Sequence, residues 1–349
     1  MTSSPTSIPV RILTGSLGAG KTTLINALLN AGHLKGSAII VNEFGDVGID
    51  HDLIERSSDD VNLLAGGCLC CHVKEDLVDA LMRLEKAVRD GVGRAFDRVI
   101  IETSGLAEPA PLLHMFAQSP YLQGRFHLEG LITVVDAQLG AIELQKPDST
   151  AMRQAVLADR LLISKAERVN PEHASQLRDE LSALNPFAFQ MPVHTTHPSP
   201  EWLAPIPPSD GRPGRENGLL YKEAMRSWDA VHDDELCCFD LQWTGSQPLP
   251  MVGEWLHQIA ETYGERLMRV KGIVCCPESF GAYAVHVVQH IVSAPQTVHA
   301  SPGTNRLVFI TRGLEPNDVR PDWQHSTRIA QASRRAPRLF SSGSVDPRI

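Results

Sequence analysis

The first half of the chain alternates short apolar runs with amphipathic segments. The apolar runs predict strands at residues 8–14, 37–42, 61–64, 97–103, 131–136, 160–164 and 192–195. Apolar residues at helical spacing predict helices at 21–31, 73–90, 152–159 and 171–184; the second carries Leu77, Leu81, Leu84 and Val88 on one stripe. This alternation predicts an α/β fold, a parallel sheet with helices on both faces.

The second half has a different pattern. Residues 198–235 are rich in Pro, Gly, Ser and charged residues, which is typical of a linker. Strand patterns at 235–243, 267–275, 282–290 and 306–312 then accompany one amphipathic helix at 249–263, so we expect a smaller C-terminal α+β domain. The predicted divisions are a first domain at 8–197, a linker at 198–235, a second domain at 236–325 and a disordered tail at 326–349.

Composition narrows the class of protein. The chain has 349 residues, 42% hydrophobic and 21% charged, which is ordinary for a globular protein of about two domains. Its net charge of −9 argues against a general nucleic-acid partner, because an acidic surface repels phosphate backbones. No apolar run approaches the ~18 residues of a membrane span, and no secretory signal pattern opens the chain. We therefore expect a cytoplasmic protein whose seven cysteines are free thiols or metal ligands.

The strongest motif in the first half is GSLGAGKT at residues 15–22, which fits the phosphate-binding loop pattern between a strand and a helix. The backbone N–H groups of such a turn face phosphate oxygens, and the helix N-terminus adds partial positive charge. Lys21 can reach the β- and γ-phosphates, and the Thr22 hydroxyl can bind Mg²⁺. The predicted nucleotide-binding residues of this loop are Gly15, Ser16, Gly18, Ala19, Gly20, Lys21, Thr22 and Thr23.

Two acidic segments follow the loop. Residues 42–50 contain two glycines and three carboxylates, Glu43 among them, and occupy the place where a phosphate-loop enzyme commonly senses the γ-phosphate. Glu102 ends a buried strand, where the acid that organises Mg²⁺ sits in such folds. Gly105, three residues later, can place its N–H on the γ-phosphate. Lys21, Glu102 and Gly105 are therefore the predicted catalytic residues.

A compact thiol cluster follows two glycines in the sequence GGCLCCH. Thiolates favour Zn²⁺ or Cu⁺ over Mg²⁺, so Cys68, Cys70 and Cys71 are candidate ligands of a transition metal. A fourth ligand could be Glu43, His72 or water. Two other interpretations remain open: the cysteines could be small buried core residues, or they could form a vicinal redox switch. The thiols at 237–238 and 275–276 are neighbours on strands, face opposite sides and are expected to be structural.

The segments GSLGAGKTT, NEFGDVGID, GGCLCC and IIETSGLAEP together resemble the CobW-type family of phosphate-loop GTPases, with UreG, HypB and the nitrile hydratase activators as wider relatives. The resemblance runs from about residue 8 to residue 320. It implies GTP hydrolysis coupled to the handling of a transition metal, most often zinc, with cobalt as an alternative. By the same resemblance, Lys21, Thr22 and Glu102 would serve GTP and Mg²⁺, while Cys68, Cys70 and Cys71 would hold the transferred metal.

Residues 164–167 read SKAE, where family members usually carry Asn-Lys-x-Asp. The acid of that motif accepts hydrogen bonds from guanine N1–H and N2, and it rejects adenine because the acid would be left unpaired. Ser164 replaces Asn, and Glu167 is one methylene longer than Asp. Ser164, Lys165 and Glu167 are therefore the expected base-side residues, with a guanine preference whose strictness stays open.

The sequence supports a switch in which GTP assembles the thiol site and hydrolysis loosens it, so that metal passes to a client protein. We expect slow intrinsic turnover, because no Gln follows Gly105 and no arginine finger is evident. The expected partners are GTP or GDP and a metal-requiring client, and a nucleotide- or metal-dependent dimer stays open. Two rival classes are a nucleotide-binding module with structural zinc and a small-molecule kinase that prefers ATP.

Overall fold

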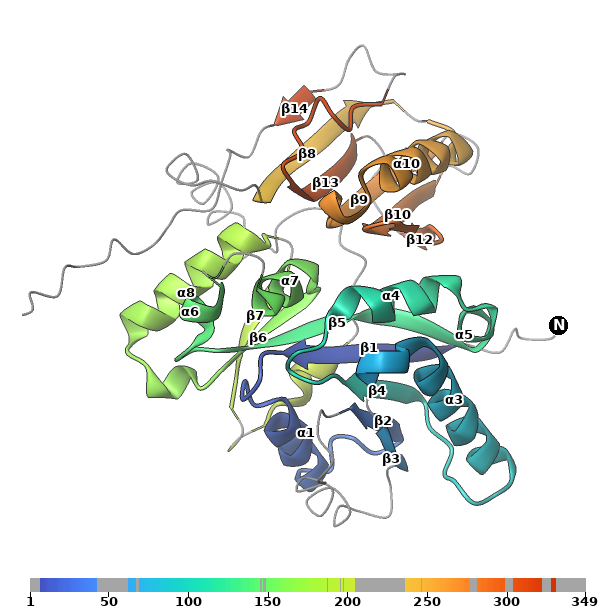
Figure 1. Cartoon of the computed structure of the whole chain (residues 1–349), viewed down its shortest axis with the longest axis vertical. Helices are drawn as coiled ribbons and strands as arrows, with labels where there is room; N and C mark the ends of the chain where they lie inside the picture. Colours follow the sequence, from blue (N-terminus) through green and yellow to red (C-terminus); the bar gives the residue numbers. More distant parts are fainter. Residues whose placement is uncertain are drawn as a thin grey trace, which may run out of the picture. The chain divides into compact units, whose positions relative to one another are not determined.

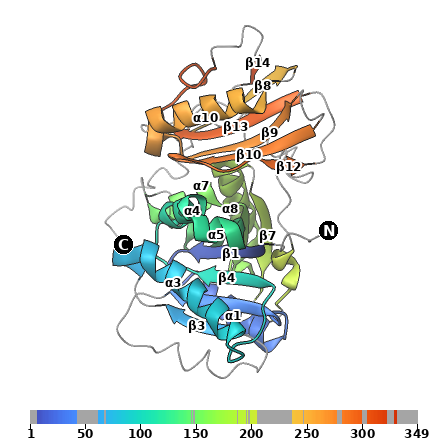
Figure 2. The same cartoon turned by 90° about the vertical axis from the view of Figure 1, so that its right-hand side faces the viewer.

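The computed structural model describes residues 7–42, 62–66, 69–144, 146, 149–186, 188–194, 196, 198–204, 236–245, 247–276, 281–298, 304–321 and 328–330. The chain divides into two units, Met1–Glu180 with Phe187–Pro208, and Leu181–Pro186 with Ser209–Ile349. Figures 1 and 2 show the elements of each unit. The predicted linker and tail lie almost entirely outside the described residues.

The first unit is built on a seven-stranded sheet in the order β3-β2-β4-β1-β5-β6-β7, and every pairing in it is parallel. This confirms the predicted class of fold. The strands are β1 Ile8–Gly15, β2 Ser37–Asn42, β3 Asn62–Gly66, β4 Arg98–Glu102, β5 Phe126–Asp136, β6 Arg160–Ser164 and β7 Phe189–Val193. Because all strands run the same way, the ends of β1, β4, β5 and β6 gather functional residues at one edge.

Helices cover both faces of this sheet (Figure 1). On one face, α1 (Lys21–Asn30) buries Leu24, Ile25 and Leu28 against Leu13 and Ile132 of the central strands. The remaining helices are α3 Leu69–Arg89, α4 Pro109–Gln118, α5 Pro120–Arg125, α6 Gly140–Leu144, α7 Thr150–Leu157 and α8 Pro171–Leu184. The described residues also form two short 3-10 helices, Ala166–Arg168 and Pro200–Leu203.

Several predicted boundaries are corrected by the structure. The helix expected at 152–159 begins at Thr150, because the Ser149 hydroxyl caps it by accepting from Met152 N at 3.1 Å. It ends at Leu157, since Ala158 is extended and the Asp159 carboxylate accepts from Leu131 N at 2.8 Å. The final strand lies at 189–193 instead of 192–195, and α4, α5 and α6 escaped prediction.

The second unit contains a seven-stranded sheet ordered β11-β10-β9-β13-β8-β14, with β12 paired to β10, and its pairings are antiparallel. With the long helix α10 it forms the expected α+β unit. Its elements are β8 Leu236–Thr244, α10 Leu249–Tyr263, the 3-10 helix Gly264–Arg266, β9 Arg269–Cys276, β10 Gly281–Val288, β11 Ile291–Val292, β12 Gln296–Val298, β13 Thr304–Arg312 and β14 Arg328–Ala330.

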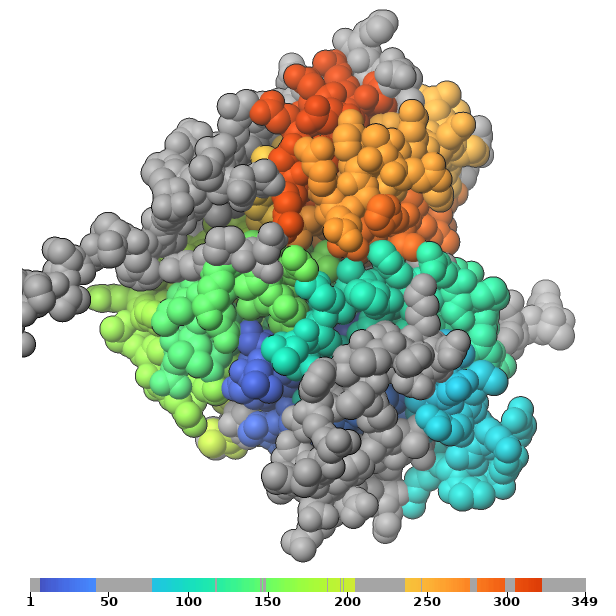
Figure 3. Space-filling view, in the orientation of Figure 1, coloured from blue at the N-terminus to red at the C-terminus, as the bar shows by residue number. Residues whose placement is uncertain are grey.

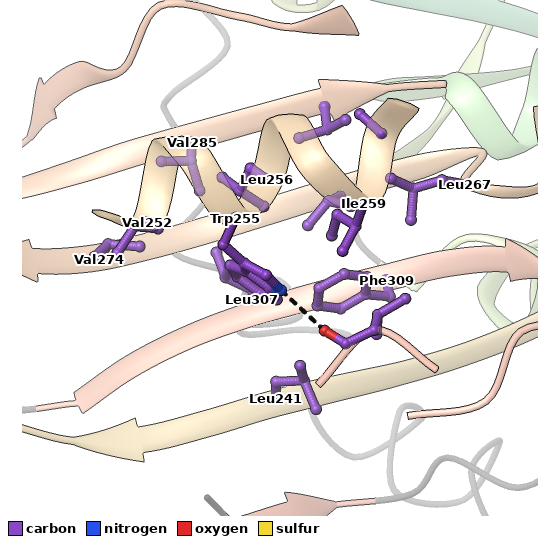
Figure 4. Packing of buried hydrophobic residues seen from close by; sticks show 14 of the residues in the cluster. Leu241, Val252, Trp255, Leu256, Ile259, Leu267, Val274, Val285, Leu307 and Phe309 are labelled. Carbon is purple, nitrogen blue, oxygen red and sulfur yellow. Dashed lines mark hydrogen bonds between the residues drawn. The ribbon is translucent and has the colours of Figure 1, made fainter. Parts of the chain in front are cut away.

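The core of the second unit lies between α10 and one face of this sheet (Figure 4). Trp255 packs against Phe309 with ring centroids 6.2 Å apart, and its indole Nε1–H donates to Val319 O at 3.1 Å. Cys237 packs against this core, whereas its neighbour Cys238 is buried from the opposite face. The strand pleat thus separates the two thiols, as the sequence predicts.

Candidate functional site

The phosphate-binding loop connects β1 to α1 at the carboxyl edge of the first sheet. Gly15 has φ +138°, and a Cβ added there would lie 2.2 Å from Val134 O of β5, so only glycine fits. Gly18 and Gly20 have φ of +74° and +99° and face open space, and α1 begins directly after Gly20. In Figure 3 part of this blue segment reaches the surface between teal and green segments. The loop thus adopts left-handed backbone at Gly18 and Gly20, where glycine is favoured.

Lys21 lies across the loop that precedes it. Its ammonium donates to Gly15 O at 2.7 Å and to Ser16 O at 3.0 Å, and the residue is only 7% exposed. A buried cation held at the mouth of a glycine loop provides positive charge where phosphate oxygens would bind. The binding of phosphates by Lys21 stays a prediction, and its ammonium lies at the loop where that prediction needs it.

Thr22 and Glu102 meet although 80 residues separate them. The Thr22 hydroxyl donates to Glu102 Oε1 at 2.6 Å, and Glu102 is 2% exposed at the end of β4. The strands β1 and β4 are direct neighbours, and Leu13 is in register with Glu102, so the sheet itself brings the two oxygens together. A hydroxyl and a carboxylate in contact are oxygen donors that suit Mg²⁺.

Gly105 packs directly on the phosphate loop. A Cβ on Gly105 would lie 2.4 Å from Leu17 N and 2.5 Å from Leu17 Cα. The turn that carries it is closed by Ala107 N donating to Ser104 O at 3.0 Å and by Leu106 N donating to the Ser104 hydroxyl at 3.2 Å. The Gly105 N–H makes no hydrogen bond with another described residue. It is thus a donor available beside the loop.

Ser164 and Lys165 contact the other side of the same loop. The Ser164 hydroxyl donates to Ala19 O at 2.6 Å, and the Lys165 ammonium donates to Gly18 O at 2.8 Å. Lys165 has φ +57° and also forms an ion pair with the buried Asp136 at the end of β5. Ser164, which stands where the family usually has Asn, therefore still contacts the phosphate loop. The ion pair with Asp136 holds the Lys165 ammonium beside the same loop.

Glu167 stands beyond this contact in the short helix that follows Lys165. It is 51% exposed, and its carboxylate lies 3.5 Å from His194 Nδ1 and 3.7 Å from Arg168 Nε. Glu167 is thus an exposed acid beside two basic groups, and its contact with a base stays a prediction. The structure thus places His194 beside Glu167.

The thiol cluster lies outside what the structure describes in side-chain detail. Glu43 and Cys68 are outside the described residues, while Cys70 and Cys71 are described only as backbone in the first turn of α3. Within the described side chains, no group of three or more His, Cys, Asp or Glu is arranged to hold a metal ion. The predicted metal ligands therefore stay a prediction. Among the described helices, none is long and apolar enough to cross a membrane.

Two residues that contact the site escaped the sequence analysis. Asp136 ends a predicted buried strand, so the rule that identified Glu102 could have found it. Gln154 of α7 donates to Gly105 O at 3.4 Å and to Ala107 O at 3.0 Å from a fully buried position. No local pattern marks Gln154, because its partners lie almost 50 residues away.

Comparison with known families gives two adjacent matches. Residues 9–191 match the family described as the CobW/HypB/UreG nucleotide-binding domain. Residues 239–326 match the family described as the C-terminal domain of the cobalamin synthesis protein CobW. The first match spans the parallel sheet except its outermost residues, and the second spans the antiparallel sheet except β14 and the start of β8.

Individual proteins are similar over about half of the chain. The "Zinc chaperone YjiA" of Escherichia coli (strain K12) is 39% identical over 191 residues, which are 54% of this chain and 58% of that protein. The "Zinc-regulated GTPase metalloprotein activator 1" of Schizosaccharomyces pombe (strain 972 / ATCC 24843) is 35% identical over 190 residues, 52% of this chain and 44% of that protein. The matched region thus spans about half the length of each of these curated relatives.

A solved structure extends the likeness of fold to most of the chain. The Zn(II)-bound YjiA GTPase from E. coli superposes with a TM-score of 0.65 at 23% identity, covering 90% of this chain and 96% of that one. At this identity the likeness concerns the fold alone. It supports the fold of each unit, the parallel sheet and the antiparallel C-terminal sheet.

Proposed function

This chain belongs to the CobW/HypB/UreG nucleotide-binding family, and from that premise we propose that it is a GTP-hydrolysing metallochaperone. It binds GTP with Mg²⁺, and it couples GTP binding and hydrolysis to the binding and delivery of a transition metal, zinc above all, to a client protein. The observation that carries the proposal is the junction of three segments at one sheet edge. The loop of Lys21, the Thr22–Glu102 pair and the Gly105 turn meet there.

Each part of this junction has a role in nucleotide hydrolysis. Lys21 and the loop N–H groups bind the phosphates, and the Gly105 N–H donates to the γ-phosphate. Thr22 and Glu102 would hold Mg²⁺, which when bound neutralises charge on the β- and γ-phosphate oxygens. Their hydroxyl and carboxylate oxygens fit that ion, because hard cations prefer oxygen ligands. The GTP-bound state is then distinguished from the GDP-bound state at Gly105.

Guanine selection falls to Glu167. Its exposed carboxylate can accept from guanine N1–H and N2, whereas adenine offers no N1–H. Ser164 and Lys165 support this subsite by fixing the phosphate loop from the base side. A phosphate-release assay with GTP and ATP tests this part. Equal kcat/KM for the two nucleotides would favour a broad nucleotide hydrolase instead.

The metal is cargo, and Cys68, Cys70 and Cys71 are its proposed ligands, with Glu43 as a further donor. Cys70 and Cys71 begin α3, the helix that follows β3 directly. Thiolates are suited to zinc, and two relatives bear zinc in their names. Cobalt is the alternative cargo for the same ligands.

The decisive experiment is a Zn²⁺ competition titration of the reduced protein, with Mg²⁺ and either a non-hydrolysable GTP analogue or GDP. Coupling between sites is reciprocal and typically ~1–3 kcal/mol, so we expect zinc to bind about 5- to 150-fold more tightly with the analogue. Cys70→Ala should abolish the tight site. Cys275→Ala, which removes a partly exposed thiol of the second unit, is the matched control and should leave it intact. Equal zinc affinity in both nucleotide states would refute the switch.

A further inference from the structure

The Gly105 turn, residues 104–107, is bonded to the buried side chain of Gln154. Within the turn, the N–H groups of Leu106 and Ala107 are bound by Ser104. The carbonyls of Gly105 and Ala107 point the other way, and both accept from Gln154 Nε2, at 3.4 and 3.0 Å. One amide therefore fixes two of the turn's carbonyls while the Gly105 N–H stays available.

Gln154 is itself firmly placed. It is fully buried in α7, and its main-chain carbonyl accepts from the Thr133 hydroxyl of β5 at 2.7 Å. Its Oε1 atom is buried and has no hydrogen-bond partner among the described residues. An unsatisfied buried acceptor is costly, so an apolar residue would serve mere packing better. The amide is therefore best explained by its two bonds to the turn.

A second contact from α7 reaches the far end of the same turn. Arg153 Nη1 lies 2.5 Å from Glu108 Oε1, and both side chains are partly exposed. Two adjacent residues of one helix thus hold residues 105–108, and this segment packs against the phosphate loop at Leu17. A displacement of the turn toward or away from the loop must break contacts with α7.

We propose that Gln154 is a positioning residue for nucleotide hydrolysis, which fixes the Gly105 turn so that the protein discriminates GTP from GDP. The inference rests on the proposed GTPase function. GTP differs from GDP only in the γ-phosphate, so discrimination depends on groups that reach that phosphate. A turn that is already ordered binds the γ-phosphate without a further entropic cost of ordering, which favours GTP. GDP has no γ-phosphate to contact the turn, so its affinity does not depend on that order.

The test compares Gln154→Leu with wild type and with Gln190→Leu. Gln190 is the matched control, because it is also a buried glutamine whose Nε2 donates to a carbonyl, Arg178 O at 3.1 Å, and it lies on the edge strand β7. Dissociation constants are measured for a non-hydrolysable GTP analogue and for GDP, together with single-turnover hydrolysis. Thermal melting checks the fold of each variant.

We expect Gln154→Leu to weaken the GTP analogue about tenfold, since two hydrogen bonds to the turn are lost, with GDP affinity within about twofold of wild type. Single-turnover hydrolysis should slow by a similar factor, and Gln190→Leu should keep the wild-type ratio of affinities. If Gln154→Leu fails to fold, Glu108→Gln provides the test at a partly exposed position, with the same direction and about a two- to threefold change.

The outcomes separate the two claims. A wild-type protein that neither prefers nor hydrolyses GTP overturns the proposed function. A wild-type protein that does both, beside a folded Gln154→Leu variant with an unchanged GTP-to-GDP ratio, overturns the positioning role alone. A loss of affinity for GTP and GDP in equal measure also counts against it, because that is the effect of a purely structural residue.

Discussion

Gly105→Ala is the sharpest test of the site. The added Cβ would lie 2.4 Å from Leu17 N, whereas ordinary contact begins at 3.4 Å, so the turn and the phosphate loop must separate by about 3.4 − 2.4 = 1.0 Å. The nearest atoms are backbone atoms of Ser16 and Leu17, which have no flexible end that could move aside. Misplacement of reacting groups by about 1 Å can cost roughly 100-fold in rate. We expect GTP hydrolysis to fall by about that factor.

The assay is single-turnover phosphate release, with GDP affinity measured in parallel by fluorescence titration. GDP binding should change much less than hydrolysis, because the altered contact lies at the turn that meets the γ-phosphate. Gly124→Ala is the matched control, since Gly124 lies in α5 and a Cβ there would meet nothing within 4 Å. This control should hydrolyse GTP at the wild-type rate and gain up to ~1 kcal/mol in helix stability.

A folded Gly105→Ala protein with wild-type hydrolysis would refute the reasoning. It would mean that the turn does not touch the phosphate loop in the catalytic state, so that Gly105 could not bind the γ-phosphate as proposed. Equal losses for GDP binding and GTP hydrolysis would instead place the damage in the phosphate loop as a whole.

Four further predictions follow from the contacts and burial of single residues. Glu102→Gln should raise the Mg²⁺ concentration needed for half-maximal hydrolysis about 10- to 100-fold, since a charged oxygen donor is lost; an unchanged Mg²⁺ titration would contradict the assignment. Ser164→Ala should weaken GTP and GDP equally, by about two- to tenfold, because it removes a bond to Ala19 O in the loop shared by both nucleotides; a change in their ratio would argue otherwise. Burial raises the pKa of Glu180, so its ionised form destabilises the fold at neutral pH, and Glu180→Gln should raise Tm at pH 7. The gain should vanish below the pKa of Glu in the unfolded chain, about 4.3, because the carboxyl is then protonated in both states. Melting curves across this pH range check the prediction. Burial, reinforced by the nearby Asp240 carboxylate, raises the pKa of the Cys238 thiol, so alkylation of the folded protein at pH 8 should modify Cys275 well before Cys238, as peptide mass spectrometry would show.

Local pattern was enough to predict the fold class and the phosphate loop. The strands β1, β2, β4 and β6 are short apolar runs that the sheet buries on both faces. Such runs are typical of buried parallel strands, so the sequence alone predicts them. The helix boundaries were harder. Ser149 caps α7, which begins two residues before the predicted start, and α4 to α6 lack a strong amphipathic stripe long enough to recognise.

Contacts across the chain were beyond sequence reasoning. Glu102 could be assigned because acids at strand ends have a general role, and the structure places it 2.6 Å from Thr22. Gln154 could not, since an isolated glutamine in a short helix carries no signal until α7 is seen behind the Gly105 turn. The thiol cluster shows the opposite case: its sequence is the most specific mark in the chain, yet its side chains lie outside the described residues.

One continuous segment, residues 154–165, supports the phosphate loop in two ways, directly at one end and through the Gly105 turn at the other. At its start, Gln154 holds the turn that meets the loop at Leu17, and at its end Ser164 and Lys165 bond the carbonyls of Ala19 and Gly18. The two contacts have different consequences. Under the proposed function, the contacts with Ala19 and Gly18 should affect every nucleotide, because they shape the loop proposed to bind the phosphates that GTP and GDP share. The contact through Gly105 should affect GTP alone, because only GTP carries the γ-phosphate. Substitutions at the start of this segment should therefore weaken GTP binding selectively, whereas substitutions at its end should weaken GTP and GDP binding alike. This difference distinguishes a γ-phosphate sensor from a rigid nucleotide-binding site.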